Sequence, residues 1–262
     1  MKNLQTIALI SLSLAATSSA DIVQKKVSYT SGETKFEGVL VYDDVLTEPS
    51  PSILMVPNWM GVTEAAIEKA IEVAGQDRVV FVADMYGVDV RPADAGEAGK
   101  AAGAVRADRA MMRSRAQLAL DTFLQQEAPT DKERTAAIGF CFGGGTVLEL
   151  GRTEADLDAI VSFHGDLVSP TLEDDAAKTK AKVLVLHGAA DPFVPQEDVA
   201  QFEQAMLATE VDWQLVQFSN TVHSFTDPEA KMTGKAEYNE TSSKRAFTYM
   251  DNLFSSLFTS KE

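Results

Sequence analysis

Short apolar runs alternate with segments of helical character over most of the chain. The apolar runs are four to six residues long and lie at 52–56, 79–83, 135–140, 159–163, 183–186 and 213–218. The helical segments between and after them are expected at 64–74, 101–126, 146–150, 199–207 and 236–258. Strands buried on both faces read as continuous apolar runs, and their alternation with helices is typical of a parallel sheet with helices on both sides.

Two further segments, 26–30 and 35–42, alternate apolar and polar residues and are joined through Ser31-Gly32, a turn signal. They predict an antiparallel hairpin before the parallel sheet. Residues 168–181 are rich in Asp and Lys and are expected to form an exposed excursion. No Pro- or Ser-rich linker divides the chain, so we expect one α/β domain over residues 21–262.

The predicted helix at 101–126 carries four arginines: Arg106, Arg109, Arg113 and Arg115. They lie mainly away from its apolar stripe, so the pattern favours a solvated helix face for them.

The first twenty residues differ from the rest. Lys2 precedes an apolar run from Ile7 to Ala16, and Ser18 and Ala20 fit the small-residue positions before a cleavage site. This is typical of a secretory signal peptide, with an uncleaved N-terminal anchor as the alternative. We expect cleavage after Ala20 and a secreted or periplasmic protein. No later segment is apolar enough to span a membrane.

The chain has 262 residues, 23 of them basic and 39 acidic, and a net charge of −16. Its composition excludes collagen-like, coiled-coil and wholly disordered chains. The charge argues against nucleic acid or an anionic membrane as a partner. Cys141 is the one cysteine and cannot form an internal disulfide, so it is either buried and inert or retained for chemistry.

Cys141 lies in the run Gly139-Phe140-Cys141-Phe142-Gly143-Gly144-Gly145, after a predicted strand and before a helix. This is the nucleophile-elbow pattern with Cys in place of Ser. Glycine is needed beside such a sharp turn, and the helix N-terminus that follows stabilises a thiolate and an oxyanion. A phosphate-binding loop is the alternative interpretation, but this run has neither the GxGxxG spacing nor the Gly-Lys-Ser/Thr ending of such loops. An inert Cys beside a packing turn also stays open.

Asp191 and His223 each follow an apolar strand in the same way. With Cys141 they give the order nucleophile, acid, histidine of the α/β-hydrolases. We therefore expect Cys141 to attack an acyl carbon, His223 to act as base, and Asp191 to orient the imidazole. The backbone N–H groups of Phe142 and Trp59 are expected to form the oxyanion hole.

The other two histidines, His164 and His187, precede glycines at strand ends and are interpreted as structural. A metal site could in principle be formed by His164, His187, Asp191 and His223. The chain has no HxH or HExxH spacing at these positions to support such a site. We expect neither a metal nor an organic cofactor.

The chain resembles the dienelactone hydrolase family of α/β-hydrolases, through the Cys elbow, Asp191 with Gly188, and His223-Ser224-Phe225. The segments Ala83–Gly87 and Tyr238-Asn239 fit the family as well. The resemblance covers roughly residues 26–258. It implies an α/β-hydrolase fold, a Cys141–His223–Asp191 triad and hydrolysis of esters or lactones.

Two departures concern the substrate pocket, for which Asn58, Tyr86 and Arg91 are the candidates. The family often has a Glu that helps to activate the thiol where this chain has Asn58, which cannot accept a proton. Dienelactone hydrolases also bind the substrate carboxylate with arginines, one of them shortly after the histidine. Here Asp227 follows instead and would repel a carboxylate. Arg91 is a candidate substitute.

Three functions remain. The first is an exported cysteine-dependent hydrolase that cleaves a small ester or lactone through an acyl-enzyme. The second is a non-catalytic binding protein of the same fold, suggested by Asn58. The third is a thiol redox protein, which would need a partner because the chain has no resolving cysteine. The acyl and alcohol parts of the substrate and the oligomeric state stay open.

Overall fold

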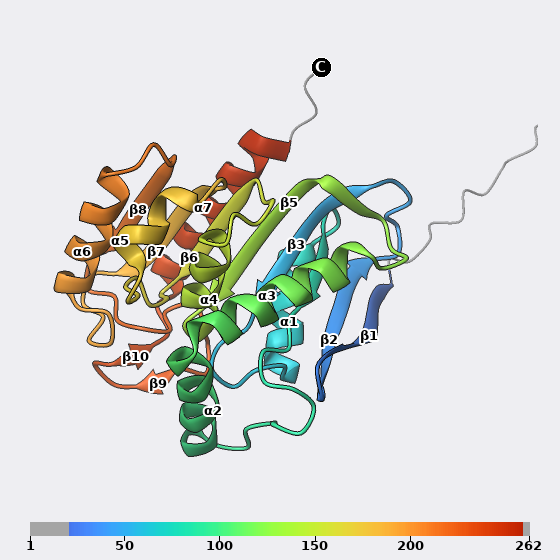
Figure 1. Ribbon diagram of the computed structural model, residues 1–262, viewed down its shortest axis with the longest axis horizontal. Coiled ribbons are helices and arrows are strands. Elements are labelled where there is room, and N and C mark those ends of the chain that lie inside the picture. The colour runs from blue at the N-terminus through green and yellow to red at the C-terminus, as the bar shows by residue number, and fades with distance from the viewer. Residues whose placement is uncertain (1–20, 259–262) are drawn as a thin grey trace, which may run out of the picture.

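The computed structural model describes residues 21–258, so the predicted signal peptide lies outside the described residues. Its main sheet has the strand order β1-β2-β4-β3-β5-β6-β7-β8 (Figure 1). The strands are β1 (Ile22–Ser31), β2 (Thr34–Asp43), β3 (Ser50–Val56), β4 (Val79–Val82), β5 (Thr130–Phe140), β6 (Ala159–Phe163), β7 (Lys182–Gly188) and β8 (Trp213–Phe218). The pairs β1·β2 and β2·β4 are antiparallel, and β4 through β8 are parallel. The predicted fold class and its N-terminal hairpin are confirmed.

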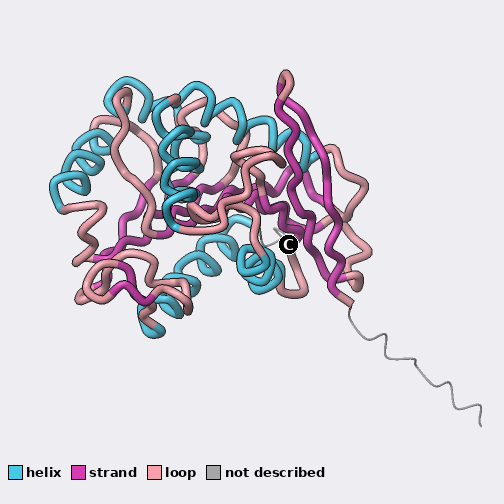
Figure 2. Tube along the Cα trace, turned by 90° about the horizontal axis from the view of Figure 1, so that it is seen from below, coloured by secondary structure: helices cyan, strands magenta, loops and turns pink. Residues whose placement is uncertain are grey.

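Helices cover both faces of this sheet (Figure 2). One apolar layer holds α1 (Glu64–Ala74) and α7 (Glu240–Phe258) against the sheet. The other layer holds α2 (Ala95–Ala107), α3 (Arg109–Leu124), α4 (Phe142–Gly151), the short α5 (Leu172–Asp175) and α6 (Gln196–Leu207). Because both faces are covered, the central strands are apolar throughout, which is why the sequence shows them as unbroken runs. Within residues 21–258 we find no helix with the length and apolar character that crossing a bilayer requires.

Two predicted helices were wrong in extent. The segment 101–126 belongs to two helices, α2 and α3, which part at Asp108. Asp108 has a non-helical backbone, and its carboxylate accepts the N–H of Met111 at 2.9 Å, so it caps α3 and ends the continuous helix. The C-terminal helix begins at Glu240 rather than at residue 236, because residues 236–237 form β10 with β9 (Lys231–Met232).

The prediction of a solvated arginine face was also wrong. Arg113 pairs with buried Glu149 of α4 at 2.7 Å and with Asp175 at 2.8 Å. Arg106 pairs with Asp166 at 2.6 Å. A buried carboxylate such as Glu149 requires a cation beside it, and that partner comes from a helix distant in sequence. The excursion at 168–181 is likewise only partly exposed, since it supplies Asp175 and buries Leu172.

The turn into α4 depends on two glycines. A Cβ at Gly143 would lie 2.0 Å from the carbonyl oxygen of Val56, and one at Gly139 would lie 2.1 Å from the carbonyl oxygen of Gly143. These are contacts with backbone, which cannot rotate away. The strand β3, the strand β5 and the start of α4 therefore meet at a spacing that only glycine allows.

This spacing predicts opposite outcomes for two Gly→Ala substitutions. Gly143→Ala should destabilise the protein by about 3 kcal/mol or more, because backbone must move to make room. Gly103→Ala lies inside α2 with nothing within 4 Å, and should stabilise it by about 1 kcal/mol through helix propensity. Urea unfolding of the three proteins checks both, and equal stability of the two variants would contradict the close contact.

Candidate active site

Cys141 occupies the sharp turn between β5 and α4. Its backbone has a φ of 54° and a ψ of −115°, a conformation that residues other than glycine rarely adopt. Its N–H donates to the carbonyl of Phe163 at 3.0 Å and to Nδ1 of His164 at 3.1 Å. The side chain is half-buried. Helix α4 starts at the next residue, so its first-turn N–H groups and its positive dipole end lie beside the thiol.

His223 and Asp191 form a close pair at the carboxyl edge of the sheet. His223 Nδ1 lies 2.7 Å from Asp191 Oδ2. The other carboxylate oxygen accepts the N–H groups of Phe193 at 2.8 Å and Val194 at 3.3 Å. Both side chains are buried. Asp191 is therefore fixed by its own loop, and it fixes the ring of His223.

The charge state of His223 follows from these neighbours. Burial disfavours the imidazolium, but hydrogen bonds to Asp191 and Cys141 and the charges of both groups outweigh it and raise the pKa of His223 to about 10. Asp191 engages Nδ1, so Nε2 is the nitrogen left for Cys141. The structure thus brings Cys141, His223 and Asp191 together, from loops 50 and 32 residues apart in sequence.

The backbone of His223 is held by an element that the sequence pattern did not predict. The N–H of His223 donates to the carbonyl of Lys235, and its carbonyl accepts the N–H of Glu237, at 3.1 and 3.0 Å. Both partners belong to the β9–β10 hairpin. The available signal was Gly234, which takes a φ of 70° in its turn.

His164 supports the elbow from behind. Its Nδ1 accepts the N–H of Cys141, so Nε2 carries the proton and donates to Thr226 Oγ1 at 2.9 Å. Burial holds the pKa of His164 well below its usual value, which keeps the ring neutral. The ring also lies edge-on to that of His223, with centroids 5.1 Å apart. These contacts are those of a residue that holds the loops together.

His187 is buried, and neither of its ring nitrogens has a hydrogen-bond partner in the described chain. Burial lowers its pKa. Among residues 21–258, no three His, Cys, Asp or Glu side chains are arranged to hold a metal ion.

Tyr86 contacts both residues expected to form the oxyanion hole. Its hydroxyl donates to the carbonyl of Trp59 at 2.8 Å, and its ring packs against that of Phe142, with centroids 5.5 Å apart. Burial raises the pKa of Tyr86, so the hydroxyl keeps its proton and stays a donor. Trp59 lies in the loop after β3, which the close contact at Gly143 brings against the start of α4.

The three candidate pocket residues do not gather around Cys141. Asn58 turns its side-chain oxygen to its own loop, accepting the N–H of Met60 at 3.0 Å, and lines a cavity of about 200 Å³ with His164 and Asp227. Tyr86 and Arg91 line a different cavity, of about 560 Å³. Cys141, Asp191 and His223 line neither of the two. Arg91 pairs with buried Asp84 at 2.8 Å.

Comparison with known proteins agrees with the fold. The family model described as the dienelactone hydrolase family matches residues 36–258. A solved dienelactone hydrolase-like promiscuous phosphotriesterase from metagenomic libraries is 40% identical, with a TM-score of 0.84, and the match covers 91% of this chain and 99% of that one.

Curated relatives are more distant. A probable 2-oxo-3-(5-oxofuran-2-ylidene)propanoate lactonase of Bradyrhizobium sp is 26% identical over 75% of this chain and 81% of its own length. An uncharacterized protein of Caenorhabditis elegans is 36% identical, but the match spans 38% of this chain and 64%, less than two thirds, of that protein.

The raised pKa of His223 predicts how stability varies with pH. Protonated His223 is favoured in the folded state, so its contribution is complete below about pH 6.5 and is lost as the pH rises through about 10. The free energy of unfolding of the protein should thus exceed that of His223→Gln most at pH 6, with the gap narrowing towards pH 10. Urea unfolding across this range measures the gap, and a constant gap would contradict the assignment.

Proposed function

The chain belongs to the dienelactone hydrolase family, as its motifs predicted, and we propose that it hydrolyses a small carboxylic ester or lactone through Cys141, His223 and Asp191. The observation that carries the proposal is the position of His223. Its ring is hydrogen-bonded to Asp191 on one side and to Cys141 on the other. A base held between an orienting acid and a nucleophile is the arrangement that nucleophilic catalysis requires.

The reaction then has two halves. Cys141 Sγ attacks the acyl carbon as the thiolate of an ion pair with His223, which already holds the thiol proton on Nε2. The C–O bond breaks, His223 protonates the leaving alkoxide, and a thioester to Cys141 remains. Water then attacks the thioester and gives its proton to His223. The thiolate of Cys141 leaves, the acid is released, and the ion pair with protonated His223 is restored. In a lactone the alcohol stays tethered to the acyl chain, and the product is a hydroxy acid.

The negative charge on the acyl oxygen needs donors fixed in advance. We assign this role to the N–H groups of Phe142 and Trp59. Phe142 is the first residue of α4, whose first-turn amides have no acceptor within the helix. Tyr86 acts as a positioning residue for both, since it is hydrogen-bonded to the Trp59 carbonyl and packed on the ring of Phe142. Loss of one such donor costs about 100- to 1,000-fold in rate.

Asn58 bears on how the thiol is activated. It cannot take up a proton, and its side-chain oxygen already accepts a hydrogen bond within its loop. We therefore propose that His223 alone receives the thiol proton, aided by the N-terminus of α4. The lactone part of the substrate class is supported by the similarity to the Bradyrhizobium relative, a probable lactonase.

We also propose that the protein is exported, with cleavage after Ala20. The support is the sequence alone: a short apolar run after Lys2, followed by small residues.

The nucleophile is tested with 4-nitrophenyl acetate. Cys141→Ala should lower kcat/KM about 1,000-fold or more, since the bond-forming atom is gone. Iodoacetamide should attach to one site per chain, because the sequence has one cysteine, and should abolish turnover in parallel. Full turnover by Cys141→Ala would reject the hydrolytic triad. Background rates in both proteins on a broad ester panel would favour the non-catalytic alternative.

The positioning role of Tyr86 is tested with Tyr86→Phe. The ring packing stays while the hydrogen bond to Trp59 is lost, so kcat should fall about tenfold with KM nearly constant and a loss of stability of about 1 kcal/mol. Tyr249→Phe is the matched control, since Tyr249 is an exposed tyrosine on α7. An unchanged kcat in Tyr86→Phe would show that its hydroxyl is only structural.

A further inference from the structure

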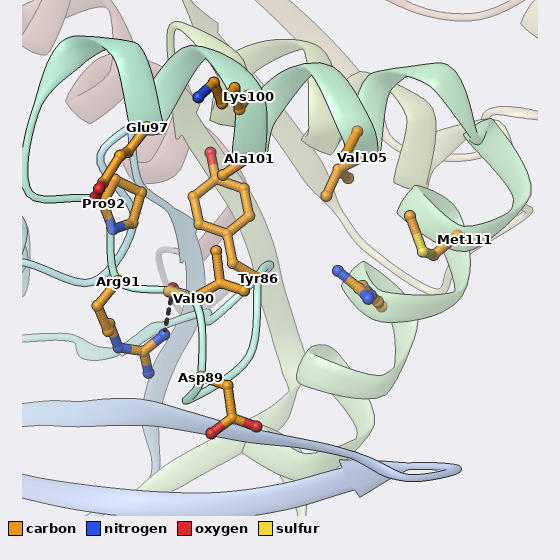
Figure 3. A pocket seen from close by; sticks show the side chains of 12 residues that line it. Tyr86, Asp89, Val90, Arg91, Pro92, Glu97, Lys100, Ala101, Val105 and Met111 are labelled. Carbon is orange, nitrogen blue, oxygen red and sulfur yellow. Dashed lines mark hydrogen bonds between the residues drawn. The ribbon is translucent and has the colours of Figure 1, made fainter.

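The larger cavity lies outside the proposed triad. It has a volume of about 560 Å³, within the range of small-molecule sites, and is bounded by α2, the start of α3 and the loop 86–92 (Figure 3). Tyr86, Val90 and Val105 give it an apolar wall. Figure 3 shows Tyr86 and Val90 at its centre, with Met111 at one end and Glu97 beside Pro92 at the other.

Two cations in this wall, Arg115 and the exposed Lys100, have no ion-pair partner among the described residues, and Arg115 is the more buried of the two. Arg115 is half-buried, donates to the carbonyl of Met85 at 2.7 Å and stacks over Phe36 at 5.2 Å. Its carboxylate neighbours, Asp84 and Asp108, act on it only through longer-range attraction. Burial outweighs this attraction and lowers the pKa of Arg115. A guanidinium in this state gains more from an incoming anion than a solvated one does.

The other charges are arranged around it. Arg91 is held by Asp84 and by the carbonyl of Gly87, at 2.8 and 2.6 Å, so its charge is compensated. Arg115 follows Met111 by four residues and therefore shares its face of α3. Glu97 lies at the opposite end, where its carboxylate accepts the N–H of Ala93 at 2.9 Å. The exposed side chains of Lys100 and Asp89 complete the wall.

The smaller cavity has the opposite character. Glu68, Glu72, Asp227 and Glu229 line it, with Lys69 as the cation among them, and Lys69 is paired with Glu72 at 2.5 Å. An anion would be repelled there. The end of the large cavity at Arg115 is therefore the better place for an anion of the two cavities.

We propose that this cavity binds an organic carboxylate with an apolar body. The carboxylate contacts the free N–H groups of Arg115, and the body lies against Tyr86, Val90 and Val105. The ligand is either a distal part of the substrate or a separate molecule. The site does not depend on the proposed triad, although Tyr86 connects it to the Trp59 loop.

The test uses 4-phenylbutyrate and its uncharged amide as probes, with binding measured by titration calorimetry. The carboxylate should bind at least about tenfold more tightly than the amide, as charge-assisted hydrogen bonds imply. The same difference is expected in Cys141→Ala, which separates this site from the triad. Equal binding of the two probes, or no binding of either, would overturn the proposal.

Two pairs of variants locate the site. Ala104→Trp fills the cavity from the exposed side of α2 and should abolish binding, whereas Ala110→Trp, exposed on α3 outside the lining, should leave it intact. Arg115→Gln should weaken the carboxylate about tenfold while the amide is unaffected, and Arg115→Lys should restore part of the loss. Because Arg115 also packs on Phe36, folding is checked by circular dichroism, and the Ala104→Trp pair stands independently of it. Unchanged binding in Ala104→Trp would place the probe elsewhere and refute the site.

Kinetics with 4-nitrophenyl acetate identify the source of the ligand. Competitive inhibition by 4-phenylbutyrate, lost in Ala104→Trp, assigns the cavity to a distal part of the substrate. Binding without competition assigns it to a separate ligand.

Discussion

The close approach of backbone at Gly143 is the constraint on which the proposed site depends. The start of α4 touches the carbonyls of Val56 and Pro57, with no room for a side chain. This contact joins the elbow of β5 and α4 to the loop after β3. It therefore sets the strained backbone of Cys141, the direction of the α4 N-terminus and the place of Trp59 at once. A shift of this joint would move the proposed nucleophile and one proposed oxyanion donor relative to each other.

Beyond this joint, arginines form ion pairs with a buried carboxylate. Arg152 and Arg113 neutralise Glu149, which is buried near the C-terminal end of α4. Burial alone would raise the pKa of Glu149, but the two arginines outweigh it and lower that pKa. The carboxylate stays charged, and α4 is tied to α3 by ion pairs from which most of the water is excluded. The helix that carries the elbow is thereby held at its far side as well.

Tyr86 divides the surroundings of the site into two chemical zones. On one side it contacts Trp59 and Phe142, next to the proposed catalytic groups. On the other it faces a cavity that has an unpaired arginine. Phe193, half-exposed, packs edge-on against His223 at 5.2 Å and gives the histidine an apolar neighbour on its open side. The proposed carboxylate site and the proposed triad thus lie on different sides of Tyr86.

The sequence by itself determined the strands, the α/β class, the elbow and the order of Cys141, Asp191 and His223. Each of these follows from a local sequence pattern. Apolar runs predict buried strands, glycines predict a tight turn, and polar residues just after strands predict the site loops. Helix α1 was predicted to the residue because Gly75 ends it with a φ of 52°, which is again local. Only the tertiary structure decided the roles of Arg113, Arg115 and Arg91, the hairpin behind His223, and the part played by Tyr86. Those depend on partners as distant in sequence as Phe36 is from Arg115, or on a cavity between helices, and no local pattern along the chain predicts such contacts.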